Sequence, residues 1–458
     1  MANLKSSAKL HIAVFPWFAF GHMTPYLHLS NKLSERGHTV SFLLPRGAQP
    51  KIERLSLYPD LIHFFPLDVP HVDGLPPGAE TASDVPFPSH MRLATALDRT
   101  RDQVEDILSL LKPDFVFFDF AFWVPGLARD LGIKSIYYSV VSPARHAGVL
   151  VPSLKMDKNC TPAELVQLPP GYPSPKVRLR QHEAHKTLAL LQNLGSGLTL
   201  YERLTTGMKE CDAIAMRTCR EIEGKFCDYV AGQYNKSVLL TGHVLPETES
   251  AKLEEPWAKW LGNFKPYTVV YCCLGSQSGL KKDQFQELLL GFELAQSPFL
   301  VALPPPKGCT TIEEALPDGF KERVQGRGLV HGGWVPQPAI LGHQSVGCFV
   351  SHCGYGSMWE SLLSDCQIVL IPDLGDHIIS TRLMVEELAV AVEVERAENG
   401  WITKESLCKA IGSVMDEEST VAAEVKSNHA VWKERVSSIN MQREYIDSFV
   451  QNLQHILG

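Results

Sequence analysis

Short apolar runs alternate with helix-length amphipathic stretches along most of the 458-residue chain. This alternation is typical of β-α-β units, in which parallel strands are joined by helices that cover the sheet. Several runs lack polar alternation, which is expected of strands buried on both faces. The predicted strands span residues 10–17, 39–45, 115–120, 134–140, 213–217, 267–276, 299–304, 347–354 and 367–372.

A polar, proline-marked segment divides this pattern into two halves. A chain of this length usually exceeds what one hydrophobic core can hold, so we expect two consecutive doubly wound α/β domains. The predicted boundaries are an N-terminal domain over 1–241, a linker over 242–257 and a second domain over 258–437. The proline-rich segment 168–175 is predicted to be a loop, and the tail from Val421 onward is predicted to be helical.

Charge and cysteine content limit the possible partners and compartments. The formal net charge is -8, and no long Lys/Arg block occurs, which argues against nucleic acid or an anionic membrane. No apolar segment reaches the roughly 18 residues of a membrane span, and the N-terminus lacks a signal-peptide pattern. The 11 scattered cysteines without a C-x-x-C pair suggest reduced thiols, so we expect a soluble, cytoplasmic protein.

Two polar residues follow predicted strands of the first half. His22 comes after the first strand, in a turn before a helix expected to begin near Thr24 or Pro25, and Asp119 closes the strand 115–120. Both fall at carboxyl ends of strands in one predicted sheet, so they can meet. A histidine held by a carboxylate is a general base with a fixed tautomer. Since the chain has 17 histidines, a structural role for His22 stays open at this point.

Two glycine-containing loops follow strands of the second half. One contains Gly275 and Ser276, and the other contains His352, Gly354, Gly356 and Ser357 ahead of a predicted helix. Glycines let a ligand approach the backbone, and helix N-terminal amides attract anions, so the loops suggest a diphosphate site. Alternatively, the glycines only shape tight turns between strand and helix.

Several motifs are missing from the chain. No G-x-G-x-x-G follows a strand and no G-x-x-x-x-G-K-[ST] occurs, which argues against a dinucleotide oxidoreductase and an ATP-type loop. The chain also lacks an Asp-x-Asp pair, which argues against a divalent metal held by carboxylates. His343, Cys348, His352 and Cys353 lack the paired spacings of structural zinc sites. We therefore expect neither a metal nor a cofactor, and the protein itself would neutralise a bound diphosphate.

The stretch from Trp334 to His377 resembles the signature box of plant secondary-product UDP-glycosyltransferases, with its W-x-P-Q opening, H-C-G core, S-x-x-E step and closing Asp. The resemblance extends over essentially the whole chain. It implies the GT-B fold: two Rossmann-like doubly wound parallel-sheet domains facing an interdomain cleft. It also implies acceptor binding by the first domain, UDP-sugar binding by the second, and a last helix over 438–458 that packs on the first domain.

The resemblance also implies roles for individual residues. Trp334 would stack on uracil while the backbone of Val335 pairs with the base edge, and Gln337 and Glu360 would bind the ribose hydroxyls. A flat aromatic suits a base, and a carboxylate suits a diol. The diphosphate and the sugar would be held by Ser276, His352, the amide of Gly354, Ser357, Asp376 and His377.

The chain departs from the family pattern at three positions of this box. Tyr355 and Gly356 replace the usual Trp-Asn pair, so Gly356 cannot supply the asparagine amide, although backbone contacts of both residues can substitute. His377 replaces the usual closing glutamine, a residue that contacts the sugar. A donor other than UDP-glucose is therefore expected, with rhamnose favoured over xylose, arabinose and galactose.

The H-C-G-Y-G-S variant resembles a branch-forming subgroup that adds a sugar to a flavonoid or anthocyanin 3-O-glycoside. The expected activity is metal-independent, inverting transfer by a monomer from a UDP-sugar to the sugar hydroxyl of such a glycoside, with His22 as base and Asp119 as its partner. Transfer to a flavonoid or terpenoid aglycone, and a non-catalytic UDP-sugar-binding protein, are the alternatives. Candidate acceptor contacts, which could equally be core residues, are Phe18, Phe122, Trp123 and Ser142.

Overall fold

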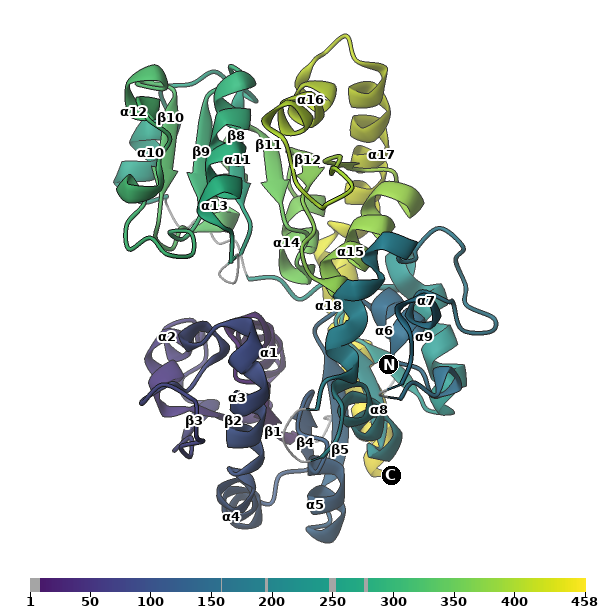
Figure 1. The fold of residues 1–458 in the computed structure, drawn as a ribbon. Coiled ribbons are helices and arrows are strands. Elements are labelled where there is room, and N and C mark those ends of the chain that lie inside the picture. Colours follow the sequence, from purple (N-terminus) through teal and green to yellow (C-terminus); the bar gives the residue numbers. More distant parts are fainter. Residues whose placement is uncertain (1–8, 158, 194–196, 247–252, 276–278) are drawn as a thin grey trace, which may run out of the picture. The chain divides into compact units, whose positions relative to one another are not determined.

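The computed structural model describes residues 9–157, 159–193, 197–246, 253–275 and 279–458. The chain forms two compact units. The first comprises Met1–Leu245 with Ser438–Gly458, and the second comprises Pro246–Ser437. Each unit is built on one parallel sheet with its own helices, which can be followed by colour in Figure 1.

The first unit contains a seven-stranded sheet in the order β3-β2-β1-β4-β5-β6-β7. Its register places Phe15 of β1 beside Phe118 of β4, so these two central strands end at the same level. The strands are β1 His11–Phe15, β2 Thr39–Pro45, β3 Ile62–Leu67, β4 Phe115–Phe118, β5 Lys134–Ser139, β6 Ala213–Met216 and β7 Val238–Leu240.

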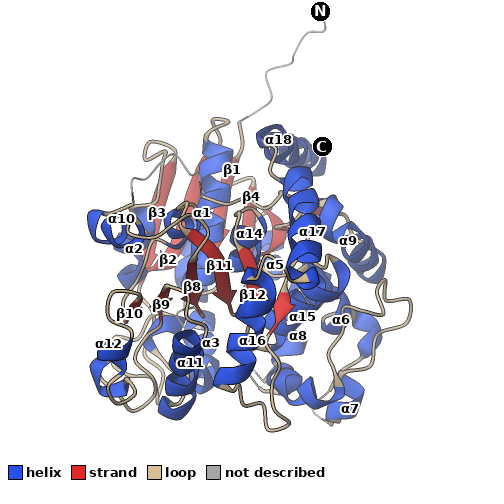
Figure 2. Cartoon of the chain, turned by 90° about the horizontal axis from the view of Figure 1, so that it is seen from above, coloured by secondary structure: helices blue, strands red, loops and turns tan. Residues whose placement is uncertain are grey.

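Helices pack against the strands of this sheet; Figure 2 draws helices in blue and strands in red. The α-helices are α1 Phe20–Ser34, α2 Gln49–Glu53, α3 His90–Asp98, α4 Arg101–Leu111, α5 Val124–Asp130, α6 Pro143–Val149, α7 Pro162–Leu165, α8 Leu200–Glu210, α9 Arg220–Tyr234 and α18 Ile439–Leu457. Short 3₁₀ helices span Arg46–Ala48, Ala82–Asp84, Phe87–Ser89 and Pro152–Leu154, and a longer one spans Gln181–Leu191.

The second unit contains a six-stranded sheet in the order β10-β9-β8-β11-β12-β13. Its strands are β8 Val269–Cys273, β9 Phe299–Ala302, β10 Gly328–His331, β11 Val346–Ser351, β12 Gln367–Leu370 and β13 Val392–Glu393. Its helices are α10 Glu255–Leu261, α11 Lys282–Leu294, α12 Phe320–Arg323, α13 Gln337–Leu341, α14 Tyr355–Leu362, α15 Gly375–Arg382, α16 Lys404–Met415 and α17 Thr420–Val436, with a 3₁₀ turn at Glu313–Ala315 and a π-helical turn at Leu383–Glu387.

Alternate residues of β8 pack on opposite faces of the second sheet. Val270 and Cys272 lie in a core with residues of α11 and α16, whereas Val269 and Tyr271 lie in a core with residues of α10 and α13. The strand is therefore buried on both sides, which explains why its sequence is apolar at nearly every position.

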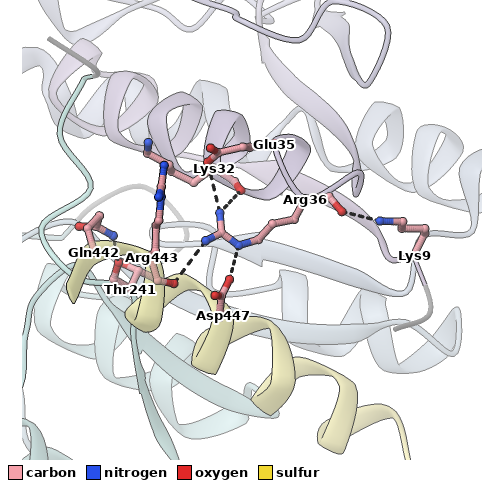
Figure 3. A network of polar contacts seen from close by, with 8 residues as sticks. All are labelled: Lys9, Lys32, Glu35, Arg36, Thr241, Gln442, Arg443 and Asp447. Carbon is pink, nitrogen blue, oxygen red and sulfur yellow. Dashed lines mark hydrogen bonds and ion pairs between the residues drawn. The ribbon is translucent and has the colours of Figure 1, made fainter. Parts of the chain in front are cut away.

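The helix α18 completes the first unit after the chain has formed the second. Its residues Ile446, Phe449, Val450 and Leu453 lie in the core built by β1, β4 and α1. On its polar side, Asp447 accepts a hydrogen bond of 2.6 Å from Arg36, which follows α1 (Figure 3). Gln442 donates to the carbonyl of Thr241 at 2.8 Å and accepts from the amide of Val244 at 3.0 Å.

The predicted α/β class with two doubly wound parallel sheets is confirmed. Segment 168–175 contains no helix or strand. Within the predicted linker, residues 247–252 lie outside the described part, and α10 begins at Glu255. The predicted helical tail consists of two helices, because the helical conformation is interrupted between Val436 and Ile439.

Candidate functional site

His22 and Asp119 form a direct hydrogen bond in the first unit. His22 Nδ1 lies 2.5 Å from Asp119 Oδ2, and the side chains of the two residues are 28% and 5% exposed. The second carboxylate oxygen, Oδ1, accepts a 2.8 Å bond from the amide of Trp17. Because β1 and β4 are neighbours in the sheet, the residues after their ends meet at one edge.

His22 lies in the first turn of α1, which begins at Phe20. The sequence-based start near Thr24 or Pro25 was therefore wrong by more than one turn. The amides of His22 and Met23 both bond the carbonyl of Ala19, so the helix is already formed ahead of Pro25. This first turn directs the imidazole toward the end of β4.

The geometry of the pair suits a base. A buried carboxylate that accepts from Nδ1–H fixes the neutral tautomer whose lone pair is on Nε2. The carboxylate is itself held by the Trp17 amide, so the imidazole has a defined orientation. This arrangement can remove a proton from a hydroxyl presented to Nε2.

The loop that follows Asp119 is held by a buried arginine of α8. The guanidinium of Arg203 lies over the rings of Phe120 and Phe122, at 5.1 and 4.8 Å from their centroids. Asp98 of α3 accepts from Arg203 and from the indole N–H of Trp123, the latter at 3.0 Å. The loop carrying the Asp119 carboxylate is thus fixed by charge and ring contacts that sequence patterns did not reveal.

The four candidate acceptor contacts differ in exposure. Phe18, Trp123 and Ser142 are buried, which favours a packing role, whereas Phe122 is half-buried. The hydroxyl of Ser142 donates to Glu223 at 2.5 Å and caps α6. An acceptor contact by any of the four stays a prediction.

In the second unit, the imidazole of His352 lies between two glycines. A Cβ added to Gly275 would lie 2.8 Å from His352 Nε2, and one added to Gly354 would lie 2.4 Å from the same atom. Gly275 also has a φ of +77°, which side chains rarely tolerate. Both glycines are therefore required by the position of the imidazole. Ser276, the next residue of this loop, lies outside the described residues.

The ring of His377 packs edge-to-face on His352, with centroids 4.6 Å apart and planes at 87°. Desolvation lowers the pKa of His352 to about 3, and the nearby His377 acts in the same direction. His352 is therefore neutral near pH 7, and its N–H group can donate a hydrogen bond to a phosphate oxygen. Nδ1 of His377 accepts from the Leu374 amide at 3.3 Å, and Nε2 lies 3.9 Å from Asp376.

The helix α14 begins at Tyr355, three residues after His352. Gly354 is its N-cap, and Tyr355, Gly356 and Ser357 form its first turn, where backbone amides lack helical partners. Tyr355 is buried, and its ring packs against Trp359 at 6.2 Å. The positive end of the helix and its amides suit an anion, in the absence of an asparagine at Gly356.

A chain of polar side chains joins α13 to α14. Gln337 donates to Ser357 at 3.0 Å and to Glu360 at 2.5 Å, and it accepts from the hydroxyl of Tyr271 at 3.3 Å. Gln337, Ser357 and Glu360 are sequence-predicted, whereas Tyr271 was missed. Trp334, three residues before Gln337, is 72% exposed, so its large flat ring lies at the surface. The next residue, Val335, is buried.

In the part of the chain that is described, no three His, Cys, Asp or Glu side chains gather as a metal site. Among those same residues, no helix has both the length and the apolar character needed to cross a bilayer.

Comparisons with known proteins agree with these features. The family described as "UDP-glucoronosyl and UDP-glucosyl transferase" matches residues 323–429. UDP-glycosyltransferase 79B3 of Arabidopsis thaliana is 54% identical over 453 residues, covering 98% of each chain. An anthocyanidin 3-O-glucoside 2'''-O-xylosyltransferase of the same plant is 52% identical over 455 residues, covering 98% of this chain and 97% of that protein.

Solved structures share the fold at lower identity. UGT89C1 of Arabidopsis thaliana, complexed with UDP-L-rhamnose, superposes with a TM-score of 0.76 at 22% identity, covering 98% of this chain and 100% of that one. A UDP-glucosyltransferase from Polygonum tinctorium gives 0.80 at 21% identity, with coverages of 98% and 99%. These likenesses confirm the GT-B fold.

Proposed function

Because the chain belongs to the plant UDP-glycosyltransferase family, we propose that this enzyme transfers a sugar, with inversion, from a UDP-sugar to a sugar hydroxyl of a flavonoid 3-O-glycoside. The acceptor class is supported by the 52% identical relative, whose name specifies an anthocyanidin 3-O-glucoside as its substrate. It is also supported by the H-C-G-Y-G-S variant at His352–Ser357, which resembles the branch-forming subgroup.

The hydrogen bond between His22 and Asp119 carries the mechanism. The proton of the acceptor hydroxyl passes to Nε2 of His22, and the hydroxyl oxygen forms a bond to the anomeric carbon. The bond from that carbon to the diphosphate oxygen breaks on the opposite face, and UDP leaves with the electron pair. Asp119 stabilises the imidazolium that forms.

The second unit supplies the donor contacts. We assign Trp334 and Val335 to the base, Gln337 and Glu360 to the ribose, and the first turn of α14 with His352 and Ser357 to the diphosphate. Asp376 and His377 contact the transferred sugar. The developing charge on UDP meets N–H donors of the neutral His352 and of the helix start, and needs no metal.

Rhamnose is the donor sugar that we favour, because His377 replaces the usual glutamine at a sugar-contacting position. Xylose is the main alternative, since a close relative is named as a xylosyltransferase. Crossing UDP-rhamnose, UDP-xylose, UDP-arabinose, UDP-galactose and UDP-glucose with flavonoid aglycones and their 3-O-glucosides, with products followed by mass, identifies both substrates. Products formed only on aglycones would overturn the acceptor assignment.

We also propose that the enzyme acts as a monomer in the cytoplasm. All eleven cysteines carry free thiols, which fits a reducing compartment.

The base assignment is tested with His22→Ala. Transfer should be abolished while the affinity for UDP, measured by calorimetry, stays within about twofold, because the proposed UDP contacts are all in the second unit. The matched control is His71→Ala, an exposed histidine of the same unit, which should keep normal turnover. Substantial turnover by His22→Ala would discard the assignment.

A further inference from the structure

The hydroxyl of Tyr271 is a buried group that the proposed mechanism does not use. Tyr271 is fully buried in the middle of β8, and its ring stacks on Phe349, its register partner in β11, with centroids 5.2 Å apart and planes at 9°. The stack fixes the ring, so the hydroxyl points toward the start of α13. There it donates to Oε1 of Gln337 at 3.3 Å.

The amide of Gln337 is bonded on both sides. Its nitrogen donates to Ser357 Oγ at 3.0 Å and to Glu360 Oε2 at 2.5 Å, which uses both N–H groups. A primary amide has two donors on nitrogen and two lone pairs on oxygen, and an ionised carboxylate only accepts. The nitrogen must therefore face Glu360, and the oxygen must face Tyr271.

The opposite orientation of this amide would be unfavourable. It would place the amide oxygen against the Glu360 carboxylate, two acceptors in contact, and the tyrosine hydroxyl would then have to accept from the amide instead of donating to it. Burial raises the pKa of Tyr271 well above its usual value, and nearby Cys273 and Glu360 act in the same direction. The hydroxyl therefore keeps its proton near neutral pH and can donate to Gln337.

We propose that Tyr271 is a positioning residue for ribose recognition: its hydroxyl fixes the amide of Gln337 so that Gln337 Oε1 and Glu360 both accept hydrogen bonds from the ribose diol. This inference rests on the proposed function, in which Gln337 and Glu360 bind the ribose. Tyr271 takes one lone pair of the amide oxygen, and the second lone pair accepts from the nucleotide. Each hydroxyl group of the diol then donates a hydrogen bond to the site, one to Gln337 Oε1 and one to Glu360.

The variant Tyr271→Phe tests this assignment, because it keeps the stacked ring and removes only the hydroxyl. UDP alone is titrated into the full-length protein by calorimetry, without sugar or acceptor. We expect binding weaker by roughly 3- to 10-fold, the size of one net hydrogen bond to a neutral group. The affinity for 2′,3′-dideoxy-UDP, which lacks both hydroxyls, should be the same in the variant and in the parent protein.

Two further variants complete the test. Tyr138→Phe removes the hydroxyl of another buried strand tyrosine, 3.4 Å from Thr241 in the first unit, and should leave UDP affinity unchanged. In a Gln337→Leu background the amide is gone, so adding Tyr271→Phe should cost no further affinity.

The outcomes separate the inference from the function on which it rests. Unchanged UDP affinity in Tyr271→Phe, or equal weakening for UDP and its dideoxy form, would overturn the role of Tyr271. A further loss of affinity in the Gln337→Leu background would overturn it as well. If the parent protein binds no UDP, the proposed function fails first.

Discussion

Arg203 donates to both carboxylate oxygens of Asp98, at 2.9 and 2.5 Å, although its side chain is 0% exposed. The pair joins α8 to α3. The guanidinium of Arg203 also donates to the carbonyl of Phe120 at 3.4 Å. Phe120 in turn packs on Trp17, whose amide holds Asp119. A charge buried in this way connects the outer helices to the carboxylate that orients His22.

Removing one member of this pair should destabilise the first unit strongly. Arg203→Met leaves Asp98 part-buried without its cation, and we expect a loss of about 3–5 kcal/mol. The matched control is Arg220→Met, which breaks another Arg–Asp pair that is 57% and 62% exposed, and should cost about 1 kcal/mol or less. Thermal unfolding midpoints of the two variants check the difference, and equal shifts would contradict it.

Asp119→Asn should lower the transfer rate by about 10² to 10⁴. An amide nitrogen can donate to Nδ1 and so place the lone pair of His22 on the wrong side, while the fold stays intact. Asp114→Asn is the control, because Asp114 precedes the same strand and accepts the amide of His11 at 2.7 Å. Initial transfer rates of the two variants are measured at saturating UDP-sugar. A rate for Asp119→Asn equal to that of the control would exclude a catalytic role for this carboxylate.

Gly354→Ala should weaken UDP binding, because its Cβ would lie 2.4 Å from His352 Nε2 and displace the imidazole. An overpacking cost of about 1–3 kcal/mol corresponds to roughly 5- to 150-fold in affinity. Gly412→Ala in α16, where a Cβ meets no atom within 4 Å, should leave binding unchanged. Calorimetric titration with UDP measures both variants, and wild-type affinity for Gly354→Ala would refute the steric argument.

Stability should fall in mild acid because His146 is buried as a neutral ring. Its Nδ1–H donates to the carbonyl of Ser142, and its buried Nε2 has no hydrogen-bond partner among the described residues. Desolvation lowers the pKa of His146 from 6.5 to about 4, with nearby Arg145 also lowering it.

The direction of the pH effect follows from this shift. Below pH 6.5 His146 gains a proton in the unfolded chain, whereas in the folded chain it does not accept one until about pH 4. The contribution of His146 to the free energy of unfolding is therefore fully present above pH 6.5 and is lost as the pH falls toward 4. The loss from this one residue is about 3 kcal/mol. His146→Phe should therefore show a flatter dependence of its unfolding midpoint on pH between 7 and 4, while exposed His71→Phe should follow the parent slope.

Removal of divalent metal should leave the transfer rate unchanged. The proposed diphosphate contacts are N–H groups of His352 and of the start of α14, and these supply the stabilisation that a metal gives elsewhere. Initial rates with excess EDTA and with added Mg²⁺ should agree within error. An activity lost in chelator and restored by a divalent cation would contradict the assignment.

The sequence predicted the internal strands of the two sheets but not their edge strands. All nine predicted runs became internal strands, whereas β3, β7, β10 and β13, which were not predicted, are the four edges of the described sheets. An internal strand is covered on both faces and flanked on both sides, so it is apolar throughout. An edge strand such as β10, with no fully buried residue, or β13, with two residues, lacks that signal.

The site residues divide in a similar way. The contact between His22 and Asp119 could be predicted because residues at the carboxyl ends of neighbouring parallel strands meet at one edge of the sheet. Tyr271 was missed because it lies inside a strand, in an apolar run where a tyrosine is indistinguishable from a core aromatic. Arg203 was missed because its partner is more than a hundred residues away in sequence. The misplaced start of α1 came from assigning Pro25 to the first helical turn, the position where proline is most common.

The return of α18 to the first unit has a consequence for synthesis. A ribosome completes the segment up to Leu245 long before it reaches Phe449 and Leu453, the side chains that close that unit's core. The domain that starts earliest is therefore finished last, with an apolar surface left open while nearly two hundred further residues emerge. Every nascent molecule must protect that surface from contact with other chains until α18 has been synthesised.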